Sequence, residues 1–327
     1  MTIDEFKKTP VGKKVSEKGY VLDTKAGLQK GGAGTVYKAL KDENWYAIKV
    51  IDHPRYDIYM NEIQCMKKIN SKYVMKITDY FYEENAEYRI AAIIMPYIDV
   101  TLSEIMNDSN IYKDEHFEQL VLKIGKDLCC GLEECHCGEL IHKDVKPSNI
   151  FFDGENYILG DFGVSKLGRG ETVIKGITDK YCAPEYKKNN RSNAQVDIYS
   201  VGVILLEILN GGYFEYIEWW NYKDGYLKNI KSEKLRKIIK KTIQTDPKKR
   251  YGTITDLRNA LEKYEKEAFS YEETIFLDES AEEHTKKKKV EIKNVTKIVK
   301  KSVIQGRKNV EKGLKTVEQT LKKSIKK

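Results

Sequence analysis

Apolar residues follow two different periods along the chain. From Tyr20 onward, strand-forming residues alternate with polar ones, and Ile90 to Ile98 form a short continuous apolar run. That run predicts a buried strand leading into a linker. Over residues 113–137 the apolar residues are instead three or four positions apart, which predicts a helix whose apolar side belongs to the core. These positions are Phe117, Leu120, Ile124, Leu128 and Leu132.

A hairpin pattern follows that helix. Ile150 to Phe152 and Tyr157 to Leu159 are apolar, and the turn-forming residues Asp153 to Asn156 separate them. The pattern predicts two short antiparallel strands. Their pairing would bring together the polar residues on either side of the hairpin.

Three of those flanking residues have the chemistry that phosphoryl transfer needs. The reaction requires a divalent ion across the phosphates of a nucleotide and a carboxylate that orients the attacking hydroxyl. Asp161 and Asn149 offer oxygen ligands for Mg²⁺, and Asp144 offers the base. The sequence therefore predicts a phosphotransferase site at the hairpin.

These residues also carry a family resemblance. His142-Lys143-Asp144-x-Lys146-x-x-Asn149 resembles the catalytic loop of eukaryotic-type serine/threonine protein kinases, and Asp161-Phe162-Gly163 resembles their metal-binding triplet. The resemblance implies an α+β, bilobal fold with a small β-rich lobe, a larger helical lobe, and ATP with Mg²⁺ in the cleft. Lys143 stands where much of the family has arginine. Lysine offers a point charge but lacks the bidentate fork of the arginine guanidinium.

A glycine-rich turn precedes these motifs. Gly31, Gly32 and Gly34 lie between two strand patterns, and glycine lets backbone N–H groups approach phosphates closely. By the resemblance, Lys49 in Tyr46-Ala47-Ile48-Lys49 reaches the α and β phosphates, and Glu62 in Asn61-Glu62-Ile63 pairs with that lysine. The first glycine of the family's loop is replaced by Gln29, and Ala33 stands at the tip.

The resemblance implies an adenine pocket as well. Met95 would border the pocket, Pro96 would offer its carbonyl to the adenine amino group, and Ile98 its N–H. Proline has no N–H to donate but keeps its carbonyl. The residues expected to sandwich the ring, which also suit core packing, are Val36, Ala47 and Phe151.

The segment after Gly163 resembles a kinase activation segment that ends in Ala183-Pro184-Glu185. Thr178 falls where serine/threonine kinases place a threonine that contacts the catalytic aspartate, and Lys146 is the catalytic-loop lysine of that class. Both imply serine or threonine acceptors. Thr172 is the candidate regulatory phosphosite, although an ordinary exposed threonine fits equally well.

Two further residues are expected to act structurally. By the resemblance, residues 197–207 form the buried helix that anchors the large lobe, where Asp197 accepts hydrogen bonds from the catalytic loop. Arg250 is expected to pair with Glu185. Buried charges need such partners.

Two other functions share parts of this pattern. A pseudokinase scaffold would bind partners without transferring phosphate, but the residues expected to carry the chemistry are all present. A small-molecule phosphotransferase shares the catalytic residues but usually lacks an activation segment closed by Ala183-Pro184-Glu185. The favoured function is therefore an ATP-dependent kinase acting on serine and threonine hydroxyls of protein substrates.

The predicted organisation has four parts. Residues 1–19 lack a clear period and are expected to be a flexible lead-in, residues 20–264 the kinase domain, residues 265–285 an acidic linker, and residues 286–327 a basic amphipathic tail. The chain of 327 residues is 40% hydrophobic, enough to bury a sizeable core. With no signal peptide and no apolar run of about 18 residues, we expect a cytoplasmic protein.

Six cysteines are few for this length, and four of them crowd one stretch beside His136. A zinc site there is one interpretation. Free thiols at the end of the helix before the catalytic loop are the other, and we favour them. The four are Cys129, Cys130, Cys135 and Cys137.

The net charge of +8 is unevenly distributed. Residues 286–327 hold 16 Lys or Arg and 3 Glu, a net of +13, so the rest of the chain has a net of −5. Apolar residues recur in this tail at steps of 3, 4 and 4, an eleven-residue period that keeps one stripe along a helix. Three roles stay open: binding an anionic membrane surface, pairing with a helical partner or a second copy, and folding back onto the acidic linker. No nucleic-acid partner is expected.

Overall fold

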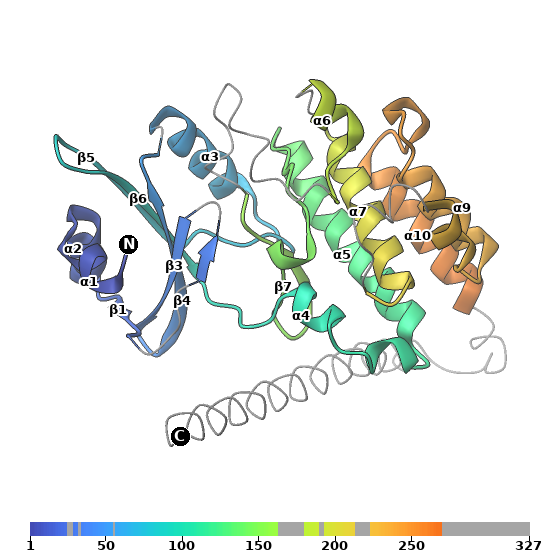
Figure 1. Ribbon diagram of the computed structural model, residues 1–327, viewed down its shortest axis with the longest axis horizontal. Helices are drawn as coiled ribbons and strands as arrows, with labels where there is room; N and C mark the ends of the chain where they lie inside the picture. The colour runs from blue at the N-terminus through green and yellow to red at the C-terminus, as the bar shows by residue number, and fades with distance from the viewer. Residues whose placement is uncertain are drawn as a thin grey trace, which may run out of the picture.

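The computed structural model describes residues 1–24, 29–31, 34–54, 56–162, 180–189, 193–212 and 223–269. Several predicted residues lie outside them, and so does the basic tail 286–327. These residues are Gly32, Gly163, Thr172 and Thr178. The described part has a strand-rich lobe and a larger helical lobe (Figure 1), so the α+β, bilobal prediction is confirmed.

An antiparallel sheet forms the small lobe. Its strands run in the order β1-β3-β4-β6-β5, with β2 paired to β3. They are β1 (Val21–Leu22), β2 (Gln29–Gly31), β3 (Gly34–Lys41), β4 (Asn44–Asp52), β5 (Asp79–Glu84) and β6 (Arg89–Pro96). Strand β6 is the predicted buried strand, and its residues Ile90 to Ile94 are buried.

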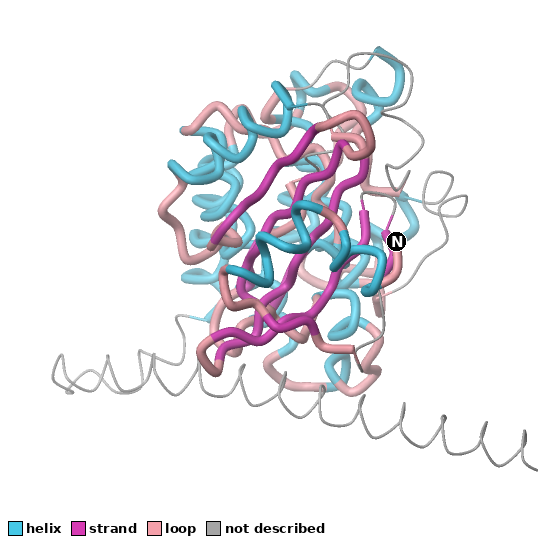
Figure 2. The backbone as a smooth tube through the Cα atoms, turned by 90° about the vertical axis from the view of Figure 1, so that its left-hand side faces the viewer, coloured by secondary structure: helices cyan, strands magenta, loops and turns pink. Residues whose placement is uncertain are grey.

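Two short helices at the N-terminus cover one face of this sheet (Figure 2). They are α1 (Ile3–Lys8) and α2 (Pro10–Glu17), and we call them the cap. Phe6, Val11 and Val15 of the cap are fully buried. The prediction of a flexible lead-in over residues 1–19 was therefore wrong.

Local chemistry explains both the cap and the error. The Thr2 hydroxyl accepts from the Glu5 backbone while the Glu5 carboxylate accepts from the Thr2 backbone, and Thr9 begins the next helix. Each helix is too short for its few apolar residues to reveal a period. The sheet supplies what the sequence pattern lacks: the Phe6 ring stacks on Tyr37 of β3 with centroids 5.0 Å apart.

Helix α5 (Phe117–Cys137) forms the centre of the large lobe together with α7 (Gln195–Leu209). The predicted apolar stripe of α5 is buried at Leu120, Ile124, Leu128 and Leu132, which confirms that helix. Helix α7 is buried along its whole length from Val196 to Ile208.

The remaining elements surround these two. The described helices of this lobe also include α4 (Leu102–Met106), α6 (Pro184–Asn189), α9 (Glu233–Thr242) and α10 (Ile254–Phe269), with short 3₁₀ turns at Ile111–Lys113, Pro147–Asn149 and Pro247–Lys249. Helix α10 crosses the predicted domain end at Tyr264. Glu265 and Glu267, expected in the acidic linker, belong to this helix and pair with Lys126 and Lys234.

The predicted hairpin is confirmed residue by residue. Strand β7 (Ile150–Phe152) pairs with β8 (Tyr157–Leu159), with Phe151 opposite Ile158. The Asp127 carboxylate on α5 accepts from the Tyr157 backbone N–H at 3.0 Å and from the Lys123 ammonium at 2.7 Å. The hairpin is thereby tied to the central helix.

Within the described ranges, no helix combines the length and the apolar character that crossing a membrane requires.

Phe6→Ala tests whether the cap belongs to the folded domain. Because the Phe6 ring is fully buried against Tyr37, its loss is expected to lower the free energy of unfolding by about 3–5 kcal/mol. Urea denaturation measures the change. Lys7→Ala, at an exposed neighbouring position, is the control and is expected to change stability by about 0.5 kcal/mol or less. Equal small effects of both substitutions would contradict a packed cap.

Candidate active site

The sheet face opposite the cap gathers the residues predicted to hold a nucleotide. Val36 pairs in register with Lys49, and Ala47 pairs with Met95. Because directly opposed and next-but-one residues share a face of a sheet, all four side chains lie on one side. Ile48 and Val50, the residues on either side of Lys49, pack with the cap cluster instead.

Side chains on this nucleotide-side face are more exposed than those on the face covered by the cap. Val36, Ala47 and Met95 are partly exposed, whereas Ile48 and Val50 are buried. Such a surface of small apolar side chains suits a flat, largely apolar ring. Tyr46 pairs with Pro96 at the end of β6, which places Pro96 at the start of the linker to the large lobe.

Two of the predicted glycines are described, and one of them is required by the backbone. Gly31 pairs with Gly34 at the turn between β2 and β3. Gly34 has a φ of 140°, and a Cβ there would lie 2.3 Å from the Val50 carbonyl oxygen. No other residue fits that position without moving β4.

Lys49 and Asp161 form an ion pair in the structure. The Lys49 side chain is buried, and the Asp161 carboxylate is partly exposed. A buried ammonium needs an anionic partner, and Asp161 is that partner here. Glu62, the predicted partner, lies on α3 (Tyr56–Lys68), but its side chain is outside the described ones.

Asp144 supplies the carboxylate of the catalytic loop. Its Oδ2 accepts from the Lys146 ammonium and from the Asn149 amide nitrogen, each at 3.0 Å. The same amide nitrogen donates to the Asp144 backbone carbonyl at 2.9 Å. The structure therefore brings together the three residues predicted to be catalytic.

The Asn149 and Asp161 side chains fit the predicted Mg²⁺. Because the amide nitrogen of Asn149 makes both described hydrogen bonds, its carbonyl oxygen is directed elsewhere and can act as a ligand. Asp161 contributes a carboxylate. One carboxylate and one amide oxygen, completed by substrate phosphates, are the kind of donor set that Mg²⁺ takes in proteins.

Aromatic packing joins the metal triplet to the catalytic loop. The Phe162 ring lies 4.5 Å from the His142 ring, centroid to centroid. His142 Nδ1 accepts from the Asp144 backbone N–H at 3.3 Å, so Nε2 donates to the Gly160 carbonyl at 3.1 Å. Asp161 has a φ of 55°, a left-handed conformation that is strained for a non-glycine residue. This packing holds Asp161 in place.

Asp197 fixes the other side of the catalytic loop. Its carboxylate, fully buried in α7, accepts from the backbone N–H groups of His142 at 2.9 Å and Lys143 at 2.8 Å. The structure bears out the expected contacts. It adds His136, whose Nε2 lies 2.8 Å from the same carboxylate. The cysteine-rich stretch suggests His136 only as a zinc ligand, and its place just before the catalytic loop is the one signal in the sequence for this contact.

The four clustered cysteines and His136 do not converge on one point. Cys129 and Cys135 are buried and Cys137 is exposed, and all are free thiols. Among the described residues no group of three or more histidine, cysteine or acidic side chains could hold a metal ion. Burial raises the pKa of the Cys129 thiol well above its ordinary value, which makes it unreactive.

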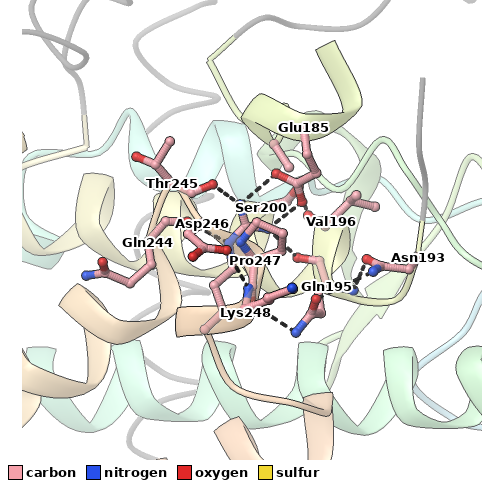
Figure 3. Close-up of polar contacts among 12 residues, drawn as sticks. Glu185, Asn193, Gln195, Val196, Ser200, Gln244, Thr245, Asp246, Pro247 and Lys248 are labelled. Atoms are coloured by element: carbon pink, nitrogen blue, oxygen red, sulfur yellow. Dashed lines mark hydrogen bonds and ion pairs between the residues drawn. The ribbon is translucent and has the colours of Figure 1, made fainter. Parts of the chain in front are cut away.

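Arg250 and Glu185 form the predicted pair. Two guanidinium nitrogens of Arg250 contact the two carboxylate oxygens of Glu185 at 2.6 and 2.7 Å. The same guanidinium also donates to the carbonyls of Gln195, Gln244 and Thr245, which are labelled together with Glu185 in Figure 3. The bidentate geometry fixes the start of α6 against the large lobe.

The sequence did not single out Glu207, yet it anchors the end of the activation segment. This buried residue of α7 pairs with the Lys180 ammonium and accepts from the Tyr181 hydroxyl at 2.7 Å. Burial raises the pKa of the Glu207 carboxyl, and hydrogen bonds from Lys180 and Tyr181 offset part of that rise. Its position on a fully buried helix was the only hint.

Comparison with known proteins agrees with this geometry. A family model described as "Protein kinase domain" matches residues 22–263. A probable serine/threonine-protein kinase from Dictyostelium discoideum is 31% identical over 204 residues, which cover 55% of this chain and 29% of that protein. Serine/threonine-protein kinase MPS1 of Encephalitozoon cuniculi is 29% identical over 74% of this chain and 43% of its own length.

A mouse protein named interferon-induced, double-stranded RNA-activated protein kinase is 28% identical over 71% of this chain and half of its own length. The chain thus spans half or less of each of these three relatives.

Asp197→Ala tests how much the buried carboxylate stabilises the catalytic loop. Because it would leave two loop amides without their partner, we expect the free energy of unfolding to fall by about 3–5 kcal/mol. Asp153 is a matched control: it also accepts from two backbone amides, those of Glu155 and Asn156, but is exposed. Asp153→Ala should cost about 1 kcal/mol or less. Chemical denaturation compares the two, and similar losses would contradict the anchoring role.

Proposed function

The chain belongs to the protein kinase family, and we propose that it transfers the γ-phosphoryl group of ATP to serine or threonine hydroxyls of protein substrates. One observation carries this proposal. Asp144, Lys146 and Asn149 contact one another on the catalytic loop, while Asp161 is paired with Lys49 of the sheet. The site thus joins a base, cationic groups and metal-binding oxygens.

In the proposed reaction, Asp144 orients the substrate hydroxyl and accepts its proton as the oxygen attacks the γ-phosphorus. The bond from that phosphorus to the bridging oxygen of ADP breaks, and ADP leaves. Lys146, 3.0 Å from the Asp144 carboxylate, stabilises the charge of the transferred group. Most of the rate enhancement in such a transfer comes from positioning and electrostatics.

The other residues bind the nucleotide. Lys49 holds the α and β phosphates, and Glu62 is its partner in the active arrangement. Asn149 and Asp161 hold Mg²⁺, which supplies charge neutralisation across the phosphates. We assign the adenine ring to Val36, Ala47, Met95 and Phe151, with Pro96 and Ile98 at its polar edge.

Two details support the assignment of the ring. Phe151 is partly exposed between the buried residues Ile150 and Phe152, so it faces away from the hydrophobic core. The Tyr97 backbone N–H donates to the Trp45 carbonyl at 3.0 Å, which ties the linker of Pro96 and Ile98 to the end of β4. Together they offer an apolar surface below the ring and a fixed backbone beside it.

Serine or threonine specificity is the finer part of the proposal. Lys146 supports it, as does the similarity to relatives named serine/threonine-protein kinases. The two alternative functions predict different results in a phosphate-transfer assay. A pseudokinase scaffold would bind nucleotide without transferring phosphate, and a small-molecule phosphotransferase would prefer metabolites to peptides.

Asp144→Asn provides the central test. Wild-type protein with labelled ATP and Mg²⁺ should phosphorylate serine or threonine peptides from a library, and not a panel of small molecules. Loss of the base is expected to slow this transfer by about 10²–10⁴-fold. Because Asp144 is not assigned to the nucleotide, ATP with Mg²⁺ should still raise the melting temperature of the variant.

The control is Asp153→Asn at the exposed hairpin turn, which should retain wild-type activity. Transfer that survives Asp144→Asn would refute the assigned base.

Mass spectrometry of the same wild-type reaction also examines Thr172, which we propose as the regulatory phosphosite. Activity with Thr172 wholly unmodified would remove that role.

For the tail we propose attachment to an anionic membrane surface, on the basis of its net charge of +13 and its apolar stripe. The full-length protein should co-sediment with phosphatidylserine-containing vesicles at low salt, and a chain shortened to residues 1–285 should not. Vesicles of neutral phosphatidylcholine are the control. If binding to anionic vesicles fails, the helical partner or the contact with the acidic linker remains.

A further inference from the structure

Tyr59 lies near the start of α3 and is fully buried. Its hydroxyl lies 3.1 Å from the carbonyl oxygen of Phe81 and 3.0 Å from that of Ala92. Phe81 and Ala92 face each other across the β5–β6 pairing. One hydroxyl of the helix therefore donates to two adjacent strands of the sheet at once.

This bond differs in kind from the apolar contacts between α3 and the sheet. Ile63 of α3 packs in an apolar cluster with Ile51, Ala91 and Ile93. Apolar contacts have no preferred direction, so they hold the helix against the sheet without fixing its position along it. A hydrogen bond depends steeply on angle and distance. Tyr59 therefore fixes the register of the helix on the sheet.

The Tyr59 hydroxyl keeps its proton and therefore remains a hydrogen-bond donor. Burial raises the pKa of Tyr59 above its ordinary value, so the hydroxyl remains protonated at any physiological pH. The ring is also confined: the Tyr82 ring lies 5.9 Å away, centroid to centroid, and the Tyr56 ring lies 4.8 Å beyond it. The side chain thus has little freedom to release the strands.

The strand that Tyr59 binds adjoins the strand of the phosphate-binding lysine. In the β4–β6 register Ala92 pairs with Val50, and the next pair is Ile93 with Lys49. Glu62 lies three residues after Tyr59 on the same helix, less than one turn away. The placement of Glu62 relative to Lys49 therefore depends on how the helix sits on β5 and β6.

We propose that Tyr59 is a positioning residue for phosphoryl transfer: its hydroxyl sets the register of α3 on the sheet and thereby the placement of Glu62 relative to Lys49. The inference rests on the proposed kinase function. The active arrangement of α3 then depends on a hydrogen bond within the small lobe. The helix is therefore held in place before substrate binds.

Tyr59→Phe removes only the hydroxyl and keeps the ring. Phe81 and Ala92 remain paired in the β5–β6 ladder, so the loss of one donor is not expected to unfold the lobe. We expect kcat for peptide phosphorylation, measured per folded molecule, to fall roughly 3- to 10-fold, the range of one hydrogen bond. The KM for ATP should change less than kcat. Hydrogen exchange of the amides of residues 56–68 should become faster.

Tyr37→Phe is a matched control in the same lobe. The Tyr37 hydroxyl also contacts two backbone carbonyls, those of Met1 and Thr2, but it ties down the cap. The substitution should speed amide exchange in residues 3–17 and leave exchange in residues 56–68 and kcat unchanged. If both variants lower kcat equally, the effect is general loosening of the lobe, and the inference is overturned.

A double-mutant cycle with Glu62→Gln decides whether Tyr59 acts through Glu62. If it does, Tyr59→Phe should change kcat less than about twofold once Glu62 is replaced, because contributions that act through one residue are not additive. Purely additive losses would overturn the inference while leaving the kinase function intact. If the wild type transfers no phosphate, the proposed function fails instead, and amide exchange in Tyr59→Phe still tests the anchor.

Discussion

A single buried carboxylate holds the catalytic loop in this protein. Asp197 lies in the most buried helix of the large lobe, and it accepts from the His142 and Lys143 backbone and contacts His136 of α5. A charge without water must be satisfied by such partners, so the three elements are constrained together. Lys143 has a φ of 66°. The loop keeps this left-handed conformation because the backbone N–H groups of His142 and Lys143 both donate to the Asp197 carboxylate.

A chain of direct contacts runs from the catalytic loop to the small lobe. The His142 ring donates to the Gly160 carbonyl and packs on the Phe162 ring, and Phe162 directly follows Asp161. Asp161 in turn reaches across to Lys49 of β4. The two lobes are thus joined at the site by an ion pair between chain positions 112 residues apart. Arg250 and Glu207 secure the far end of the same segment to the large lobe.

The small lobe shows how one sheet serves two purposes. Its strands alternate between a face sealed by the cap and a face of small, partly exposed side chains suited to a nucleotide. Tyr37 packs under the cap while its neighbour Val36 faces the site. Sealing one face stiffens the strands, and Gly34 shows how little space remains between β3 and β4 where the phosphates are proposed to bind.

Local patterns alone determined much of this structure. The hairpin of Ile150–Phe152 with Tyr157–Leu159, the stripe of α5 and the buried strand β6 were all predicted, because period and turn chemistry are local properties of the chain. The catalytic residues were readable for a similar reason: their spacing within one loop is short. The cap was missed because Phe6, Val11 and Val15 are too few to show a period without the sheet they cover.

Only the tertiary structure decided which distant side chains meet. Nothing in the sequence indicates that Lys49 pairs with Asp161, or that His136 contacts Asp197 rather than a metal. The Tyr59 hydroxyl meets Phe81 and Ala92 only because α3 crosses two strands that lie more than twenty residues further along the chain. Such contacts depend on how whole elements pack, and packing is set by the summed shape of many side chains rather than by any local pattern.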